Sequence, residues 1–162
     1  MDRFVAQLPD SVEELCLIRL GILVKSFRAW PFVARIGGAM QRSTAEAIAS
    51  GAGLLGSENF RIARGHFGLL QYWSSFEAME AWSHRPPHSD WWREALERMR
   101  LKEDFGIYHE TYLVPRAGVE SIYLNSPRVG LASFGVTGEA VGRATTSRDR
   151  LGRRAGAGAE GG

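Results

Sequence analysis

Runs of apolar residues separated by turn residues predict four strands along this chain. Residues 16–25 are rich in Ile, Leu and Val on both alternating sides, which is typical of a strand buried on both faces. Residues 59–64 and 66–73 flank Gly65 closely enough to predict a β-hairpin. Residues 106–114 predict a further strand that Pro115 ends, and residues 121–125 a short additional one.

Apolar residues spaced by three or four predict helices between these strands. Pro31 suits the first turn of a helix whose apolar stripe runs toward Gly51, where we expect the helix to end. Ser74 with Glu77 forms a capping-box pattern at the start of a second helix. The two prolines of residues 84–88 must end that helix, and a third is expected over residues 89–103.

The resulting order is strand, helix, strand, strand, broken helix, strand. This order predicts an α+β fold of the ferredoxin-like, split βαβ type, with an antiparallel sheet and helices on one face. The other sheet face would stay exposed and partly apolar, so we expect a second copy to cover it in a homodimer.

Composition divides the chain into three regions and excludes several classes of function. We expect an N-terminal arm over residues 1–14, one domain over 15–135, and a disordered Gly/Ala/Arg-rich tail over 136–162, because the tail has few large side chains to bury. Five arginines lie in that tail and the net charge is only +2, so nucleic acid is not an expected partner.

Hydropathy and cysteine content bear on location and redox chemistry. The most apolar window, residues 15–24, contains Arg19 and has about half the length of a membrane span. No membrane partner and no secretory signal are expected, which leaves the cytoplasm as the predicted location. The single cysteine, Cys16, cannot form an intramolecular disulfide and is expected to be a small buried apolar residue.

Aromatic residues are unusually dense between positions 72 and 92. At helical spacing such residues usually pack in a core, but they also suit a flat apolar pocket for a polycyclic or isoprenoid ligand. Both interpretations stay open. The residues expected at such a pocket are Trp82 and Trp92 as walls, with Trp73 and Tyr72 nearby.

Histidines are the candidate acid–base groups, because histidine titrates near neutral pH without a shift. His84 is expected at the surface, whereas His88 precedes Trp91 and Trp92 at a helix start. His109 alternates with Glu110 along a strand and shares the more apolar side with Ile107, so we expect it to face the helices. It is then either a pocket base or a core histidine.

The sequence also offers residues for two further kinds of site. Arg19, a lone charge in a strand, would anchor a ligand carboxylate or pair with Glu58 or Glu110. His88 and Asp90 with His109 could form a two-His-one-carboxylate iron site, but the expected fold is not that of the usual iron oxygenases, so no metal is predicted. The glycine-rich residues 51–57 lack the P-loop lysine and a dinucleotide fingerprint.

Several segments resemble known families. The strand-to-helix segment Gln71-Tyr-Trp-Ser-Ser-Phe-Glu-Ala-Met-Glu-Ala-Trp-Ser-His84 resembles that of antibiotic-biosynthesis-monooxygenase (ABM) domains. Residues 53–56, 88–92, 107–112 and 123–132 also resemble an uncharacterised bacterial and fungal family grouped with the monooxygenase of fumagillin biosynthesis. The resemblance covers about residues 15–135.

This resemblance implies a dimeric α+β barrel with a pocket between sheet and helices in each subunit. Related barrels include cofactor-free oxygenases, haem-degrading enzymes and haem aldoxime dehydratases, so the fold leaves the reaction open. Relatives carry an Arg and an Asn late in the first strand, where this chain has Leu23 and Lys25. If that pair takes part in the chemistry of the relatives, the activity of this chain is expected to differ from theirs or to be absent.

The leading hypothesis is a small cofactor-independent monooxygenase, or a related tailoring enzyme, acting on a bulky apolar secondary metabolite of polyketide or terpenoid type. His109 or His88 would remove a proton from the substrate, and the resulting carbanion would reduce O₂. Two alternatives remain. One is a haem-binding barrel with a histidine ligand, and the other is a non-catalytic dimer that binds a small molecule.

Overall fold

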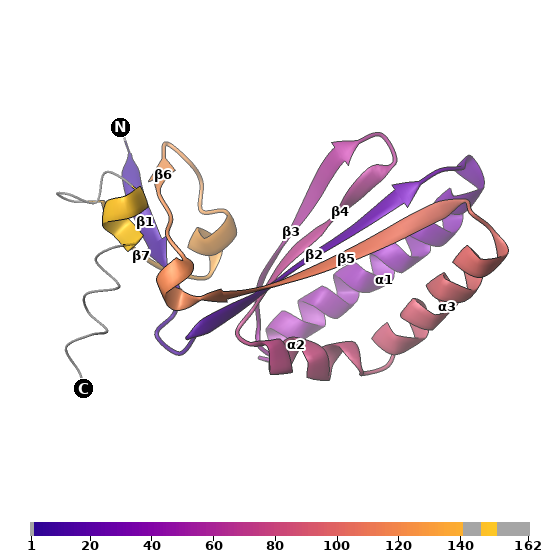
Figure 1. The fold of residues 1–162 in the computed structure, drawn as a ribbon, viewed down its shortest axis with the longest axis horizontal. Coiled ribbons are helices and arrows are strands. Elements are labelled where there is room, and N and C mark those ends of the chain that lie inside the picture. The colour runs from indigo at the N-terminus through magenta and orange to yellow at the C-terminus, as the bar shows by residue number, and fades with distance from the viewer. Residues whose placement is uncertain (1, 141–146, 152–162) are drawn as a thin grey trace. The chain divides into compact units, whose positions relative to one another are not determined.

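A computed structural model describes residues 2–140 and 147–151, and the chain divides into two compact units (Figure 1). The larger unit is Cys16–Leu113, and the other joins Met1–Leu15 with Val114–Gly162. The predicted domain limits at residues 15 and 135 stay a prediction.

A four-stranded sheet forms the larger unit. Its order is β3 (Leu54–Ala63), β4 (His66–Trp73), β2 (Glu14–Val24) and β5 (Phe105–Pro115). Strand β4 is antiparallel to both of its neighbours. Three helices lie on one face of this sheet: α1 (Trp30–Ala49), α2 (Phe76–Ser83) and α3 (His88–Leu101) (Figure 1). The predicted α+β, ferredoxin-like class is confirmed.

The helix boundaries follow local sequence signals, with one correction. Helix α2 is capped by Ser75, whose Oγ accepts a hydrogen bond of 3.1 Å from the backbone N–H of Ala78. The predicted cap, Ser74, therefore lies one residue too early. Helix α2 ends and α3 begins on either side of the two prolines, as predicted.

Strand β3 begins at Leu54, five residues before the strand that is predicted over residues 59–64. Gly51 and Gly53 have positive φ angles of 66° and 96°, which only glycine adopts easily, so the turn is complete by residue 53. Leu54, 5% exposed, then pairs with Trp73. The glycine-rich composition hides a strand start because the turn itself is very short.

The core of the larger unit lies between the sheet and the helices. One cluster gathers around Trp73 and Cys16, which are 2% and 0% exposed, so the prediction of a buried cysteine is confirmed. A second cluster joins α1, α3 and the start of β5. Its buried members are Ile22, Ala29, Val33, Ala95 and Phe105.

A second, three-stranded sheet forms the smaller unit, in the order β6 (Tyr123–Leu124), β1 (Arg3–Gln7) and β7 (Val136–Glu139). Both neighbours pair antiparallel with β1. Strand β1 lies in the predicted N-terminal arm, whereas β7 lies in the predicted disordered tail, so the prediction of disorder is wrong for residues 136–139. They pair through backbone groups, which an argument from side-chain size does not detect.

The described part of the tail also packs within this smaller unit. Residues 147–151 are helical, and Arg150 Nε lies 2.5 Å from Glu120 Oε2. The rest of the predicted tail, 141–146 and 152–162, lies outside the described residues. None of the helices within residues 2–140 and 147–151 combines the length and apolarity needed to span a bilayer.

Candidate functional site

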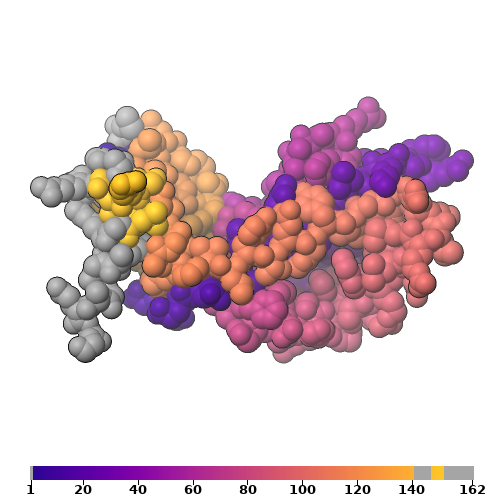
Figure 2. Space-filling model, in the orientation of Figure 1, coloured from indigo at the N-terminus to yellow at the C-terminus, as the bar shows by residue number. Residues whose placement is uncertain are grey.

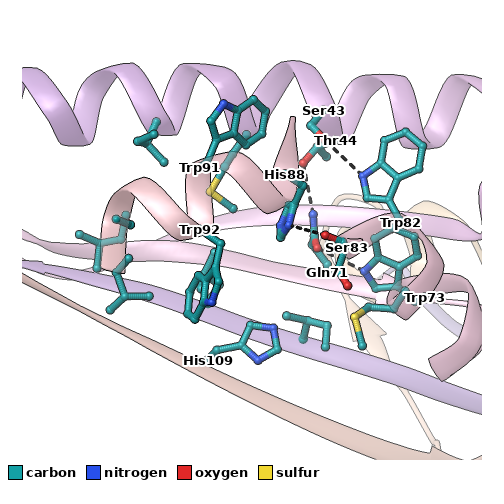
Figure 3. Close-up of a pocket in the computed structure, with 18 residues that line it drawn as sticks. Ser43, Thr44, Gln71, Trp73, Trp82, Ser83, His88, Trp91, Trp92 and His109 are labelled. Atoms are coloured by element: carbon teal, nitrogen blue, oxygen red, sulfur yellow. Dashed lines mark hydrogen bonds between the residues drawn. The ribbon is translucent and has the colours of Figure 1, made fainter. Parts of the chain in front are cut away.

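A cavity lies between the helices and the four-stranded sheet of the larger unit (Figure 3). The centre of a water-sized sphere can move through about 90 Å³ of it. One water needs roughly 10–15 Å³ by that measure, so the cavity can hold a compact organic group. Its described lining contains no Asp, Glu, Lys or Arg. The polar lining residues are Ser43, Thr44, Gln71, Ser83, His88 and His109, and the aromatic ones are Trp73, Trp82, Trp91 and Trp92.

Strand alternation decides which residues form the floor of the cavity. Ile18 of β2, Gln71 and Trp73 of β4, and His109 of β5 all point toward the helices. The predicted orientation of His109, on the helix side with Ile107, is confirmed. The structure thus brings together five of the predicted site residues: His88, His109, Trp73, Trp82 and Trp92.

His88 is held where the proline break joins α2 to α3. Its Nδ1 lies 3.1 Å from the backbone oxygen of Ser83. A carbonyl oxygen only accepts, so Nδ1 carries the hydrogen and the lone pair of the neutral ring is on Nε2. Burial lowers the pKa of His88, although the Ser83 hydrogen bond opposes this shift. The ring is therefore neutral, and able to accept a proton, at neutral pH.

His109 lines the same cavity but is exposed to solvent, as is Trp92, which is 42% exposed. These two residues therefore mark the mouth of the cavity. Partial desolvation lowers the pKa of His109, and a charge on His109 would lower the pKa of His88 further. The two rings consequently resist being protonated together, and His88 is the better shielded of the pair.

A hydrogen-bonded amide forms the polar part of the floor (Figure 3). Trp73 Nε1 donates to Gln71 Oε1 over 3.2 Å, and Gln71 Nε2 donates to Thr44 Oγ1 of α1, also over 3.2 Å. Trp82 Nε1 donates to Ser43 Oγ over 3.2 Å. Gln71, Ser43 and Thr44 are not among the site residues that the sequence predicts. One signal in the sequence could have found Gln71: it lies two residues before Trp73 in a predicted strand and therefore on the same face.

Arg19 and Tyr72, predicted to bind substrate, do not line this cavity because they lie on the opposite face of the sheet. Arg19 Nη1 lies 2.9 Å from Glu110 Oε2, and the Arg19 guanidinium lies 5.0 Å from the centre of the Tyr108 ring. The Tyr72 hydroxyl donates to Glu58 Oε2 over 3.3 Å. The ion-pair alternative for Arg19 is the one that the structure contains.

Three other sequence features also lie outside the cavity lining. His84 is exposed, as predicted, and Leu23 and Lys25 are not lining residues. The expected departure from the family pattern at these two positions stays a prediction. Within residues 2–140 and 147–151, no cluster of three His, Cys, Asp or Glu side chains is arranged to hold a metal.

Comparison with known families identifies the family of this chain. The model of the family described as monooxygenase af470-like matches residues 15–131. The chain belongs to this family. The finer resemblance to the fumagillin-biosynthesis enzyme stays a prediction. No curated protein matches the sequence.

Solved structures show the fold. An aldoxime dehydratase matches with a TM-score of 0.66 and 17% identity, over 93% of this chain and 44% of that one. The aldoxime dehydratase OxdRE, in complex with butyraldoxime, matches with a TM-score of 0.60 and 17% identity, over 92% of this chain and 42% of that one. This chain thus spans less than half of either dehydratase. SnoaB, a cofactor-independent oxygenase from Streptomyces nogalater, matches with a TM-score of 0.43 and 14% identity, over 62% of this chain and 92% of that one.

Proposed function

We propose that the protein is a cofactor-independent monooxygenase that binds the reacting end of a bulky apolar metabolite, polyketide- or terpenoid-like, in this cavity. The observation that carries the proposal is a neutral, partly buried His88 in an aromatic cavity whose described lining contains no Asp, Glu, Lys or Arg. Membership of a monooxygenase family supports it.

The first step is removal of a proton from an acidic C–H group of the substrate. Nε2 of His88 accepts this proton, and the electron pair of the C–H bond stays on the substrate as a carbanion. Because burial lowers the pKa of His88, the ring is in its basic form at neutral pH. The Ser83 carbonyl keeps the tautomer that exposes Nε2 and favours the protonated ring once it forms.

The second step is oxidation of the carbanion by O₂. The carbanion gives one electron to O₂, and the carbon radical and superoxide combine to form a C–O bond. The peroxide takes a proton back from His88, and the hydroperoxide loses water to leave a carbonyl at the original CH₂ carbon. One oxygen atom of O₂ ends in product and the other in water, with the substrate as reductant.

The tryptophans and the mouth of the cavity suit this kind of substrate. Trp73 and Trp82 supply flat apolar walls next to the sheet. Because Trp92 lines the cavity and is also exposed, the cavity reaches the surface beside it. A large molecule can therefore insert one end, while the remainder stays outside.

Haem fits these residues poorly. The described lining offers no Lys or Arg to pair with the haem propionates. The cavity volume of about 90 Å³, measured as the space open to the centre of a water molecule, is also small for a porphyrin. No step of the reaction is therefore assigned to haem. A Soret band that develops when the protein is incubated with haemin, and is lost in His109→Ala or His88→Ala, would reverse this assignment.

A second copy of the chain is the expected partner of the open sheet face. This face carries the aromatic side chains Phe60, Tyr108 and Tyr112 together with the Arg19–Glu110 ion pair. Aromatic residues and arginine are enriched in protein interfaces. We infer a homodimer in which this face is covered.

The test uses 2-indanone, a compact carbon acid, as the probe. Without O₂, the protein should catalyse deuterium incorporation from D₂O next to the carbonyl, and with O₂ it should consume oxygen. His88→Asn keeps a donor for the Ser83 carbonyl but removes the base, so both rates should fall about 10²–10⁴-fold.

Matched variants separate the two histidines. His109→Asn should lower the rates of deuterium incorporation and oxygen consumption less than His88→Asn does, because His109 lies at the exposed mouth. A larger loss in His109→Asn would transfer the role of base to His109. Full rates in both variants would reject a histidine base. Tight binding of the probe with neither exchange nor oxygen uptake would favour the non-catalytic binding dimer.

A further inference from the structure

We propose that Gln71 is the hydrogen-bond donor that holds the substrate oxygen, so that the cavity takes carbon acids activated by a carbonyl group rather than hydrocarbons. The inference rests on the proposed function for the identity of the base, His88. It adds the class of substrate and a residue that contacts the substrate.

The orientation of the Gln71 amide follows from its partner Trp73. An indole N–H can only donate, so the amide atom that faces it must be the oxygen, Oε1. The NH₂ group is then at the other end of the amide, where Thr44 Oγ1 accepts one of its two hydrogens. The second N–H is the donor that Gln71, as a lining residue, offers to a ligand.

Gln71 differs from the hydroxyl donors on the cavity wall because its N–H has a fixed direction. The Ser43 and Thr44 hydroxyls, whose oxygens accept from Trp82 and Gln71, each keep a hydrogen that rotates about the C–O bond. The Gln71 amide is instead fixed at both ends, by Trp73 and by Thr44. Nε2 of neutral His88 carries a lone pair and acts as an acceptor. A carbonyl oxygen only accepts, so it complements the amide N–H and not the His88 base.

The same contact would assist proton removal. When His88 Nε2 takes a proton from the carbon next to the carbonyl, the C–H electron pair forms a C=C bond and the C=O pair moves to oxygen. Hydrogen bonds to a charged acceptor are roughly twice as strong as neutral ones. The Gln71 N–H therefore stabilises the enolate more than the ketone, which lowers the barrier.

Paired ligands test this inference by binding alone. Equilibrium dialysis compares 2-indanone with indane, which has the same ring skeleton and no oxygen. After correction for their partitioning between water and an apolar solvent, the wild type should prefer the ketone about five- to tenfold, the value of one good hydrogen bond. Gln71→Met should abolish this preference and leave indane binding within twofold.

Two further variants control for damage to the fold. Gln71→Glu keeps an acceptor for Trp73 and an oxygen for the Thr44 hydroxyl but lacks the amide N–H, so at pH 8 it too should lose the preference. Tyr72→Phe removes the hydrogen bond to Glu58 at the adjacent residue, on the opposite sheet face. This variant should keep the preference for the ketone. Indane binding by each variant reports that its cavity is intact.

The results separate this inference from the proposed function. Ketone preference that survives in both Gln71 variants, or no binding of either probe to the wild type, would overturn the role of Gln71. Loss of the preference as expected, in a wild type that neither exchanges deuterium nor consumes O₂, would reject the oxygenase and leave the carbonyl site standing.

Discussion

The two faces of the four-stranded sheet carry polar residues that are neighbours in sequence but differ in electrostatics. On the helix side, His109 and Gln71 line a cavity in which no Asp, Glu, Lys or Arg occurs among the described lining residues. One residue further along each strand, Glu110 and Tyr72 lie on the open side among charged partners. A shift of one position thus separates candidate chemistry from an ion-paired surface.

The causes of the pKa shifts differ between these faces. For His88 the largest cause is burial, which disfavours the charged form and lowers the pKa. For Glu110 the largest is the hydrogen bond from Arg19, which favours the charged form and lowers the pKa of the carboxyl group. The helix side favours neutral groups, whereas the open side favours charged and paired ones.

The strongest test of this contrast is whether the open face is covered. If a second copy binds there, light scattering at micromolar concentration should give twice the chain mass, which corresponds to a binding free energy of about −8 kcal/mol or better. Tyr112→Glu, at the exposed end of this face, should shift the equilibrium toward monomer. A monomer mass for the wild type would contradict the homodimer.

Packing on the open face depends on a glycine at position 68. A Cβ at Gly68 would lie 2.0 Å from the backbone oxygen of Leu20, so the strands would have to separate. Gly68→Ala should lower the free energy of unfolding by about 2–3 kcal/mol, measured by urea denaturation. Gly106→Ala is the control, because a Cβ there meets nothing within 4 Å. Equal stability of the two variants would contradict close packing at Gly68.

The helix side should respond to pH through its histidines. Since the pKa values of His88 and His109 are lowered, deuterium exchange should be constant at neutral pH and fall tenfold per unit below an apparent pKa under 6.5. The free energy of unfolding should also fall as the pH falls, because burial disfavours a protonated histidine. The contribution of these groups is complete above the unfolded value of about 6.5 and is lost as pH falls through the folded pKa values.

Glu110→Gln provides the control for this profile, because its carboxylate lies on the open face. The acid limb of the exchange rate should stay at the same pH in this variant. An acid limb above pH 6.5 in the wild type would show that the base is not a desolvated histidine.

The smallest expected effect comes from removing the open-face ion pair. Arg19 and Glu110 side chains are 36% and 40% exposed, and exposed pairs contribute little to stability. Arg19→Met should leave the urea midpoint nearly unchanged and deuterium exchange within twofold. A large loss of exchange would show that Arg19 reaches the substrate, as the sequence analysis first considered.

Local sequence signals predicted the element order and the orientation of His109, because strand alternation and proline breaks act over a few residues. Which face Arg19 and Tyr72 occupy depends on strand pairing between distant segments, such as Leu17 opposite Tyr72. The bonds of Gln71 to Trp73 and Thr44 likewise depend on how α1 packs on β4. Long-range packing of this kind cannot be predicted from the residue pattern of a single segment.

The strand order also sets how different parts of the cavity open. Strands β4 and β2 are the two central strands, so their backbone amides should be among the slowest to exchange with solvent deuterium. Gln71 is attached to this persistent part of the molecule. His88 is the first residue of α3 and lies at its join with the eight-residue helix α2, outside the sheet. Transient fraying at that join would carry the base away from a floor that stays in place, giving a large ligand a route in and out without global unfolding.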